Sequence, residues 1–180
     1  MKKPVSVAFG VFAALGMAVA MSSTIYADQI AVSGSSGSGA LEPAGGVANA
    51  AVALGSCVID RTAQTFTCAA NVYNIVDLTA GHIHVGGPGT SGPVVIAIPN
   101  LPLRTSGSWG QSWTWRAADF VPNPGIGLPT FDSFAQACAA GNCYLNWHTT
   151  VSGGGAVRVN LCPKSAAANT ASGIAVCTTP

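Results

Sequence analysis

Three histidines are the side chains of this sequence best suited to carry chemistry. His82 and His84 are separated by one residue in an apolar segment, and His148 lies in a second segment of the same kind. Alternate residues of a β-strand face the same side, about 6.5 to 7 Å apart. A strand here would therefore direct the first two imidazoles at one ion and turn Ile83 away. His148 becomes the third ligand if its strand lies beside theirs.

The ligand type indicates which metal would bind. Three neutral imidazoles suit copper or zinc, and we expect copper, with zinc as the alternative. A blue-copper electron-transfer site is disfavoured because it needs a cysteine thiolate. A fourth position would be filled by water, an external ligand or an oxygen such as that of Tyr144. The competing interpretation is that the histidines are hydrogen-bonded strand residues that hold no metal.

Residues 1–27 are typical of a secretory signal peptide. Lys2 and Lys3 precede an apolar stretch from Val5 to Met21, and small and polar residues follow. We expect cleavage after Ala27. The protein would then be secreted or periplasmic, with no membrane span after cleavage. A membrane anchor is the alternative interpretation of the same stretch.

Export determines how the six cysteines are interpreted, because thiols pair in an oxidising compartment. Six cysteines allow 15 pairings, which the sequence alone does not distinguish, but local geometry favours Cys57 with Cys68, Cys138 with Cys143, and Cys162 with Cys177. The first pair would face each other across a hairpin that turns near residues 62–63, and the second would bracket a helix end at Gly141. The third would tie down the C-terminal tail. A zinc site built from cysteines is not indicated, because the paired Cys-x-x-Cys spacings that it needs do not occur.

Short apolar segments separated by glycines and polar turns predict an all-β chain. The expected strands are Val47–Leu54, Ser56–Asp60, Thr65–Val72, Ile75–Leu78, Pro93–Ile98, Tyr144–Val151 and Ala156–Leu161. One helix is expected, starting at a cap on Thr130 or Asp132 and running to about Ala139. Together these segments predict an antiparallel, Greek-key-like β-sandwich with one short helix, stapled by disulfides.

Length and composition limit the organisation and the partners. The 180 residues allow one domain of ordinary size. We expect a flexible N-terminal segment at 28–46, in which the run Val32–Gly46 is either a linker or a loose first strand, then the sandwich at 47–162 and a tail at 163–180 that a disulfide ties down. A net charge of +1, with 7% charged residues, offers no patch that would neutralise phosphates. No nucleic-acid partner is expected.

Other chemistries fit the sequence less well. Gly87–Gly92 has the spelling of a dinucleotide-binding motif, but a strand follows it where that motif needs a helix. The six acidic residues form no close pair of the kind that glycoside hydrolysis uses. Three tryptophans, Trp109, Trp113 and Trp115, could stack on sugar rings, and ordinary packing is the competing interpretation.

Four motifs in order resemble the CHRD (chordin) domain. They are Ala80–His84, Gly89–Val95, Tyr144–Thr150 and Gly155–Arg158, and the resemblance covers about Ala40 to Leu161. It implies a β-sandwich module that is found in chordin, an extracellular growth-factor-binding protein, and in many exported bacterial proteins. That family usually ends on a strand with a glutamate and a second glycine, and both are missing here.

The His82-x-His84 pair is also similar to the copper strand of Cu,Zn superoxide dismutase. Arg158 follows a glycine-rich stretch, as the active-site arginine of that family does. The dismutase copper site uses four histidines, however, and this chain has three. Arg158 is thus a possible catalytic residue, and a strand salt bridge or carbonyl network is its competing role.

These observations lead to one expected function and two alternatives. We expect an exported CHRD-like sandwich that binds copper or zinc through its histidines, for metal handling or for redox chemistry on small oxidants. The first alternative is a non-enzymatic surface module that self-assembles or binds a protein partner. The second is a copper-dependent oxidoreductase with dismutase-like activity.

Overall fold

The computed structural model describes residues 29–35 and 50–163. The expected signal peptide, most of the N-terminal segment and Cys177 lie outside these residues. The elements are β1 Gln29–Ser35, β2 Val52–Asp60, β3 Thr65–Ile75, β4 Leu78–Val85, β5 Val94–Ala97, β6 Gly107–Arg116, the short 3-10 turns Ala117–Asp119 and Pro124–Ile126, α2 Phe131–Ala139, β7 Cys143–Thr149 and β8 Val157–Pro163. Within the described residues, no helix is long and apolar enough to cross a membrane.

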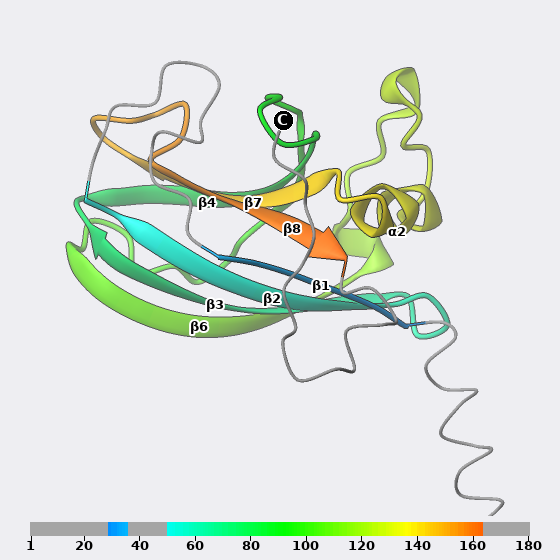
Figure 1. Ribbon diagram of the computed structural model, residues 1–180, viewed down its shortest axis with the longest axis horizontal. Helices are drawn as coiled ribbons and strands as arrows, with labels where there is room; N and C mark the ends of the chain where they lie inside the picture. The colour runs from blue at the N-terminus through cyan, green and yellow to red at the C-terminus, as the bar shows by residue number, and fades with distance from the viewer. Residues whose placement is uncertain (1–28, 36–49, 164–180) are drawn as a thin grey trace, which may run out of the picture.

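The strands form one curled antiparallel sheet in the order β5-β4-β7-β8-β1-β2-β3-β6. The sheet folds over, so that β4, β7 and β8 lie against β2, β3 and β6 with the apolar core between the two layers (Figure 1). The predicted all-β, sandwich-like fold with one short helix and disulfides is confirmed.

β2 is one continuous strand, although Gly55 led us to expect two strands separated by a turn. Its buried and exposed residues alternate from Val52 to Asp60 without interruption. A Cβ atom at Gly55 would lie 2.6 Å from the Leu145 Cδ1 atom of the opposite layer. Gly55 therefore lies within a continuous strand, where the lack of a side chain lets the opposite layer pack closely. It does not mark a turn of the chain.

The expected strand at residues 75–78 is wrong. Ile75 ends β3 and Leu78 begins β4, so this segment is the connection between the two layers. Asn74 and Asp77 take positive φ angles of 55° and 52°, which reverse the chain there. Asn and Asp tolerate this left-handed conformation better than most residues, and apolar patterning does not reveal it.

Part of the N-terminal segment that we expected to be flexible is a strand. Gln29–Ser35 forms β1, which pairs with β2 over its whole length and with β8 at Val32 and Ser33. Of the two interpretations of this segment, the structure has a first strand at residues 29–35. Small residues suffice there because β1 is held by backbone hydrogen bonds between two neighbours.

One of the two described disulfides fastens the helix to the sheet, and the other links two neighbouring strands. Thr130 caps α2, its Oγ1 accepting a hydrogen bond of 3.2 Å from the Ser133 N–H. Cys138 at the end of α2 is bonded to Cys143 at the start of β7, after a turn in which Gly141 has φ 76°. The Cys57–Cys68 disulfide joins residues that face each other in β2 and β3. The Cys162–Cys177 pair stays a prediction, because Cys177 lies outside the described residues.

The tryptophans of β6 pack into the molecule. Trp113 and Trp115 are buried, and their indole N–H groups donate to the backbone oxygens of Pro99 and Ala97 at 3.0 and 3.1 Å. Trp115 also stacks on Phe66 of β3. Because these rings are buried against protein, they are not available to stack on a sugar.

Candidate metal site

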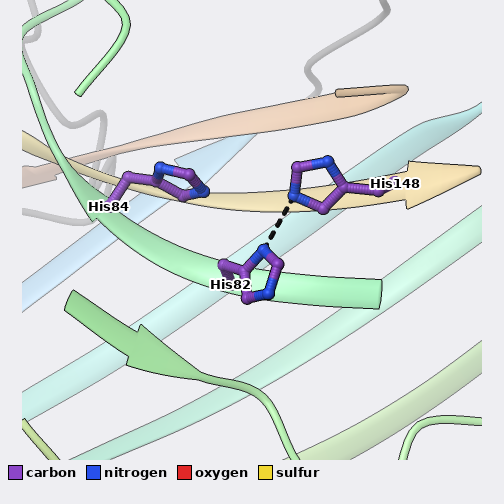
Figure 2. A group of neighbouring side chains, drawn as sticks. All are labelled: His82, His84 and His148. Atoms are coloured by element: carbon purple, nitrogen blue, oxygen red, sulfur yellow. Dashed lines mark hydrogen bonds between the residues drawn. The ribbon is translucent and has the colours of Figure 1, made fainter. Parts of the chain in front are cut away.

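The site lies on the face of β4 and β7 that points away from the core. The two strands are antiparallel neighbours, with His82 opposite Asn146 and Ala80 opposite His148. His82 and His84 point to one side of β4, and Ile83 points to the other side, where it joins the core. The neighbouring strands thus bring the three predicted residues together (Figure 2).

The three imidazoles lie close enough to share one ion. One ring nitrogen from each histidine can be chosen so that all three atoms lie within 4.8 Å of one another. The ring centroids of His82 and His148 are 4.8 Å apart, and that of His84 is 5.8 Å from His82 and 6.1 Å from His148. Nitrogens bound to copper or zinc lie about 2.0 to 2.1 Å from the metal, so ligands of one ion are about 3 to 4 Å apart. Small side-chain rotations would bring these atoms to that spacing.

Two backbone carbonyls orient two of the rings. His84 Nδ1 donates to the Gly92 oxygen at 2.8 Å, and His148 Nδ1 donates to the Gly153 oxygen at 2.9 Å. A carbonyl only accepts, so each Nδ1 carries the proton and each Nε2 keeps its lone pair. Metal-binding histidines commonly have this arrangement, in which one nitrogen is fixed by an outer hydrogen bond and the other is left for the ion.

His82 closes the group through a hydrogen bond to His148. Its Nδ1 lies 2.9 Å from His148 Nε2 (Figure 2). Since His148 Nε2 is an acceptor, His82 Nδ1 must be the donor in this state. For this nitrogen to bind a metal, the proton would move to the outer Nε2 of the same ring. That change of tautomer leaves the net charge of the histidine unaltered.

His84 Nε2 is a buried polar atom with no hydrogen-bond partner. The His84 side chain is only 7% exposed, so water has little access to it. Leaving such an acceptor unsatisfied costs about 1 to 3 kcal/mol. A cation placed among the imidazoles would satisfy this lone pair, and the donor set therefore fits a metal ion.

Burial keeps the three imidazoles neutral, which is their ligand form. It lowers the pKa of His84 to about 4, and the hydrogen bond to Gly92 opposes this shift only in part. Burial also lowers the pKa of His82, with a smaller contribution from His148. It lowers the pKa of His148 against the opposing effect of the Gly153 carbonyl. At neutral pH protons therefore compete weakly with a metal for these nitrogens.

Tyr144 and Arg158 support the site from β7 and β8. The Tyr144 ring stacks on His84 with centroids 4.8 Å apart, and its hydroxyl accepts from the Gly92 N–H at 3.0 Å. This hydroxyl, which we considered as a fourth ligand, is thus held by the backbone. Arg158 is fully buried, with its guanidinium on backbone oxygens and over the Tyr144 ring. Of its two predicted roles, these contacts correspond to the carbonyl network.

The supporting carbonyls could not be found from the sequence. Gly92 and Gly153 contribute backbone atoms, and a backbone carbonyl leaves no residue-type signal. The one sequence feature associated with these two carbonyls is that each lies in a glycine-rich segment. It reflects tight turns, and these turns place the two carbonyls against the imidazoles.

Comparison with known proteins identifies one family. The sequence model of the CHRD domain matches residues 32–161, which include all of the site residues described above. No curated protein and no solved structure matches the chain. The likeness to superoxide dismutase rests on the short His-x-His motif and the position of Arg158, and neither comparison adds support to it.

Proposed function

The chain belongs to the CHRD domain family, and from this premise we propose that it is an exported metal-binding domain. His82, His84 and His148 would hold one copper ion, with zinc as the alternative. Its role would be metal handling or redox chemistry on small oxidants.

One observation carries the proposal. His84 Nε2 is buried, lacks a partner and belongs to a group of three ligand nitrogens within 4.8 Å of one another. A set of strand histidines without a ligand would be expected to satisfy each buried nitrogen inside the protein. Here the Nδ1 atoms of His84 and His148 have backbone acceptors, and the inner nitrogens are left to each other and to an ion.

The ligand chemistry favours copper over zinc. Affinity of a nitrogen site for divalent metals is highest for copper in the first-row series, and imidazole suits both ions. Bound copper would supply one-electron chemistry, whereas zinc has no redox role. The protein contributes neutral ligands, fixed ring orientations and a largely buried setting. With three protein ligands, a further position would remain for water or a small oxidant.

Export is supported by the N-terminal sequence and by the cysteines. The basic and apolar pattern of residues 1–27 is that of a signal peptide. The Cys57–Cys68 and Cys138–Cys143 disulfides suit an oxidising compartment. A secreted or periplasmic domain would meet copper or zinc outside the cytoplasm.

Metal titration of untagged protein tests this function. Metal-free protein is titrated with Cu²⁺ and with Zn²⁺, and we expect one ion per chain at micromolar or lower concentration. His84→Ala should weaken binding strongly, while Ser112→Ala, at an exposed position on β6, should leave it unchanged. Protein that stays metal-free in micromolar copper and zinc would exclude the proposal.

A surface module that self-assembles is a second candidate, favoured by the outer face of β2 and β3. Leu54, Val58 and Tyr73 are 44%, 39% and 39% exposed there on one side of the sheet. Apolar side chains exposed on a sheet face offer a contact surface. Light scattering of the native protein and of Val58→Glu separates the two candidates, because assembly through this face would be lost in the variant. A wild-type protein that remains monomeric at high concentration would exclude this candidate.

Dismutase-like activity is the remaining enzymatic alternative. It would require copper-loaded protein to consume superoxide faster than the same concentration of free copper. A rate no higher than that background would remove this alternative and leave metal binding intact.

A further inference from the structure

Arg158 is a buried cation whose three nitrogens are all bonded. Its Nη1 donates to the Thr90 oxygen at 3.0 Å and its Nη2 to the Gly87 oxygen at 2.7 Å. Its Nε donates to Asn160 Oδ1 at 2.8 Å within β8. Two of these bonds end on the segment 86–92, which connects the end of β4 toward β5. The arginine therefore fixes a loop that lies far from it in sequence.

The same loop ends on the residue that orients His84. The Gly92 oxygen accepts from His84 Nδ1 at 2.8 Å, and the Gly92 N–H donates to the Tyr144 hydroxyl at 3.0 Å. The Tyr144 ring also contacts both Arg158 and His84. Arg158 Cζ lies 3.5 Å from its centroid, and His84 stacks on it at 4.8 Å. Since β7 lies between β4 and β8, His84 and Arg158 reach this ring from opposite sides.

The backbone of this loop packs closely against the end of β4. A Cβ atom on Gly92 would lie 1.7 Å from the Val85 carbonyl oxygen, and one on Gly86 would lie 2.8 Å from that of Thr90. Such close backbone approach makes the position of the Gly92 carbonyl dependent on the loop as a whole. A shift at Gly87 or Thr90 would therefore reach His84.

We propose that Arg158 is a positioning residue of the metal site, which acts on His84 through the segment 86–92 and the Tyr144 ring. It neither contacts the metal nor guides an anion. Its planar fork is required because a single lysine amine cannot reach three oxygens on separate residues at once. His148 is independent of it, since its Nδ1 is held by Gly153 of a different loop. The proposal rests on metal binding at these histidines as its premise.

Metal affinity is the first test, with Arg158→Lys and Arg158→Gln. Loss of a group that orients a metal ligand costs about 10- to 100-fold in affinity. We expect a loss of this size for copper and zinc in both variants. Lysine keeps the positive charge but cannot make the three hydrogen bonds of the guanidinium group, and glutamine keeps neither. In a His84→Ala background, Arg158→Lys should have no further effect on the remaining affinity. Additive losses, or wild-type affinity in both variants, would overturn the proposal.

The second test uses metal-free protein and so remains decisive even if no metal binds. Nitrogen NMR of the imidazoles reports which nitrogen carries the proton. In the wild type, His84 and His148 should both carry it on Nδ1. In Arg158→Lys, His84 should become a mixture of tautomers while His148 keeps its proton on Nδ1. Equal changes at both histidines would show a general structural role, and unchanged His84 would refute positioning.

A pair of glycine substitutions tests the loop without altering Arg158. Gly92→Ala forces the loop away from Val85 and should reproduce the His84 changes of the arginine variants. Gly154→Ala is the matched control in the other loop of the site, because its Cβ would meet nothing within 4 Å. We expect the control to keep wild-type affinity and tautomers. Wild-type behaviour of folded Gly92→Ala would contradict transmission through this loop.

Discussion

Metal binding should raise the thermal stability of the wild type and leave that of His84→Ala almost unchanged. A ligand that binds only the folded state, present at about 100 times its dissociation constant, stabilises by about 2.7 kcal/mol. For a domain of this size, about 1 kcal/mol corresponds to about 4 °C in Tm. We therefore expect saturating copper to raise the Tm of the wild type by about 10 °C.

The structure indicates the source of this stabilisation and the reason why one variant removes it. The unpartnered His84 Nε2 costs the metal-free protein about 1 to 3 kcal/mol, and a bound ion would relieve that cost. His84→Ala removes both this nitrogen and one of the three ligands. The remaining pair, His82 and His148, can still satisfy each other through their 2.9 Å contact without a metal.

The assay is thermal unfolding followed by circular dichroism, with and without metal, on chelator-treated protein. Ser112→Ala, exposed on β6 in the other layer, serves as the control and should show the full shift. A shift in His84→Ala equal to that of the wild type would place the metal elsewhere. Absence of a shift in the wild type at saturating copper and zinc would refute the reasoning altogether.

Three further predictions concern the pH dependence of stability, the Cys57–Cys68 disulfide and the ligand role of His148. The free energy of unfolding of the metal-free protein should fall as the pH drops from about 6.5 to about 4. In that range the unfolded chain binds a proton that folded His84 does not, because burial lowers the pKa of His84 to about 4. Urea unfolding at a series of pH values measures this, and a free energy that does not change with pH would contradict the burial of His84 as a neutral imidazole. Replacing Cys57 and Cys68 together by alanine should cost about 3 kcal/mol, since their disulfide closes a loop with a sequence separation of 11; denaturant midpoints measure the loss, and an unchanged midpoint would contradict it. His148→Gln removes the Nε2 lone pair that faces the other histidines and should abolish high-affinity copper binding. The near-ultraviolet circular dichroism should stay that of the wild type. A variant that keeps its copper affinity in a titration would show that His148 is not a ligand.

Much of the fold followed from local patterning. Short apolar segments bounded by turn residues predict most of β3 and β8, and the Thr130 cap predicts the start of α2, because each of these signals depends only on near neighbours. The errors occurred where a residue had a role beyond its own segment. Gly55 was interpreted as a turn because a glycine that makes space for the opposite layer looks the same in sequence. Asn74 and Asp77 reverse the chain through left-handed conformations that periodicity does not show.

The candidate site could be predicted in its ligands but not in its support. His82 and His84 share a strand face because of the two-residue repeat of β structure, and this follows from the sequence alone. That His148 joins them depended on β7 pairing with β4, a contact between residues more than 60 positions apart. The role of Arg158 was left open because its partners are backbone oxygens of a distant loop.

By itself, the sequence predicted an all-β chain, the Cys57–Cys68 and Cys138–Cys143 disulfides, and three histidines with the spacing of metal ligands. These properties are local, because periodicity, composition and residue type are written into neighbouring positions. The tertiary structure alone decided that the imidazoles meet on one face of the β4–β7 pair. It also decided that the Gly92 and Gly153 carbonyls fix two of the tautomers, and that His84 keeps a buried lone pair. These features depend on which strands are neighbours and how loops fold over them, so no short stretch of the chain encodes them.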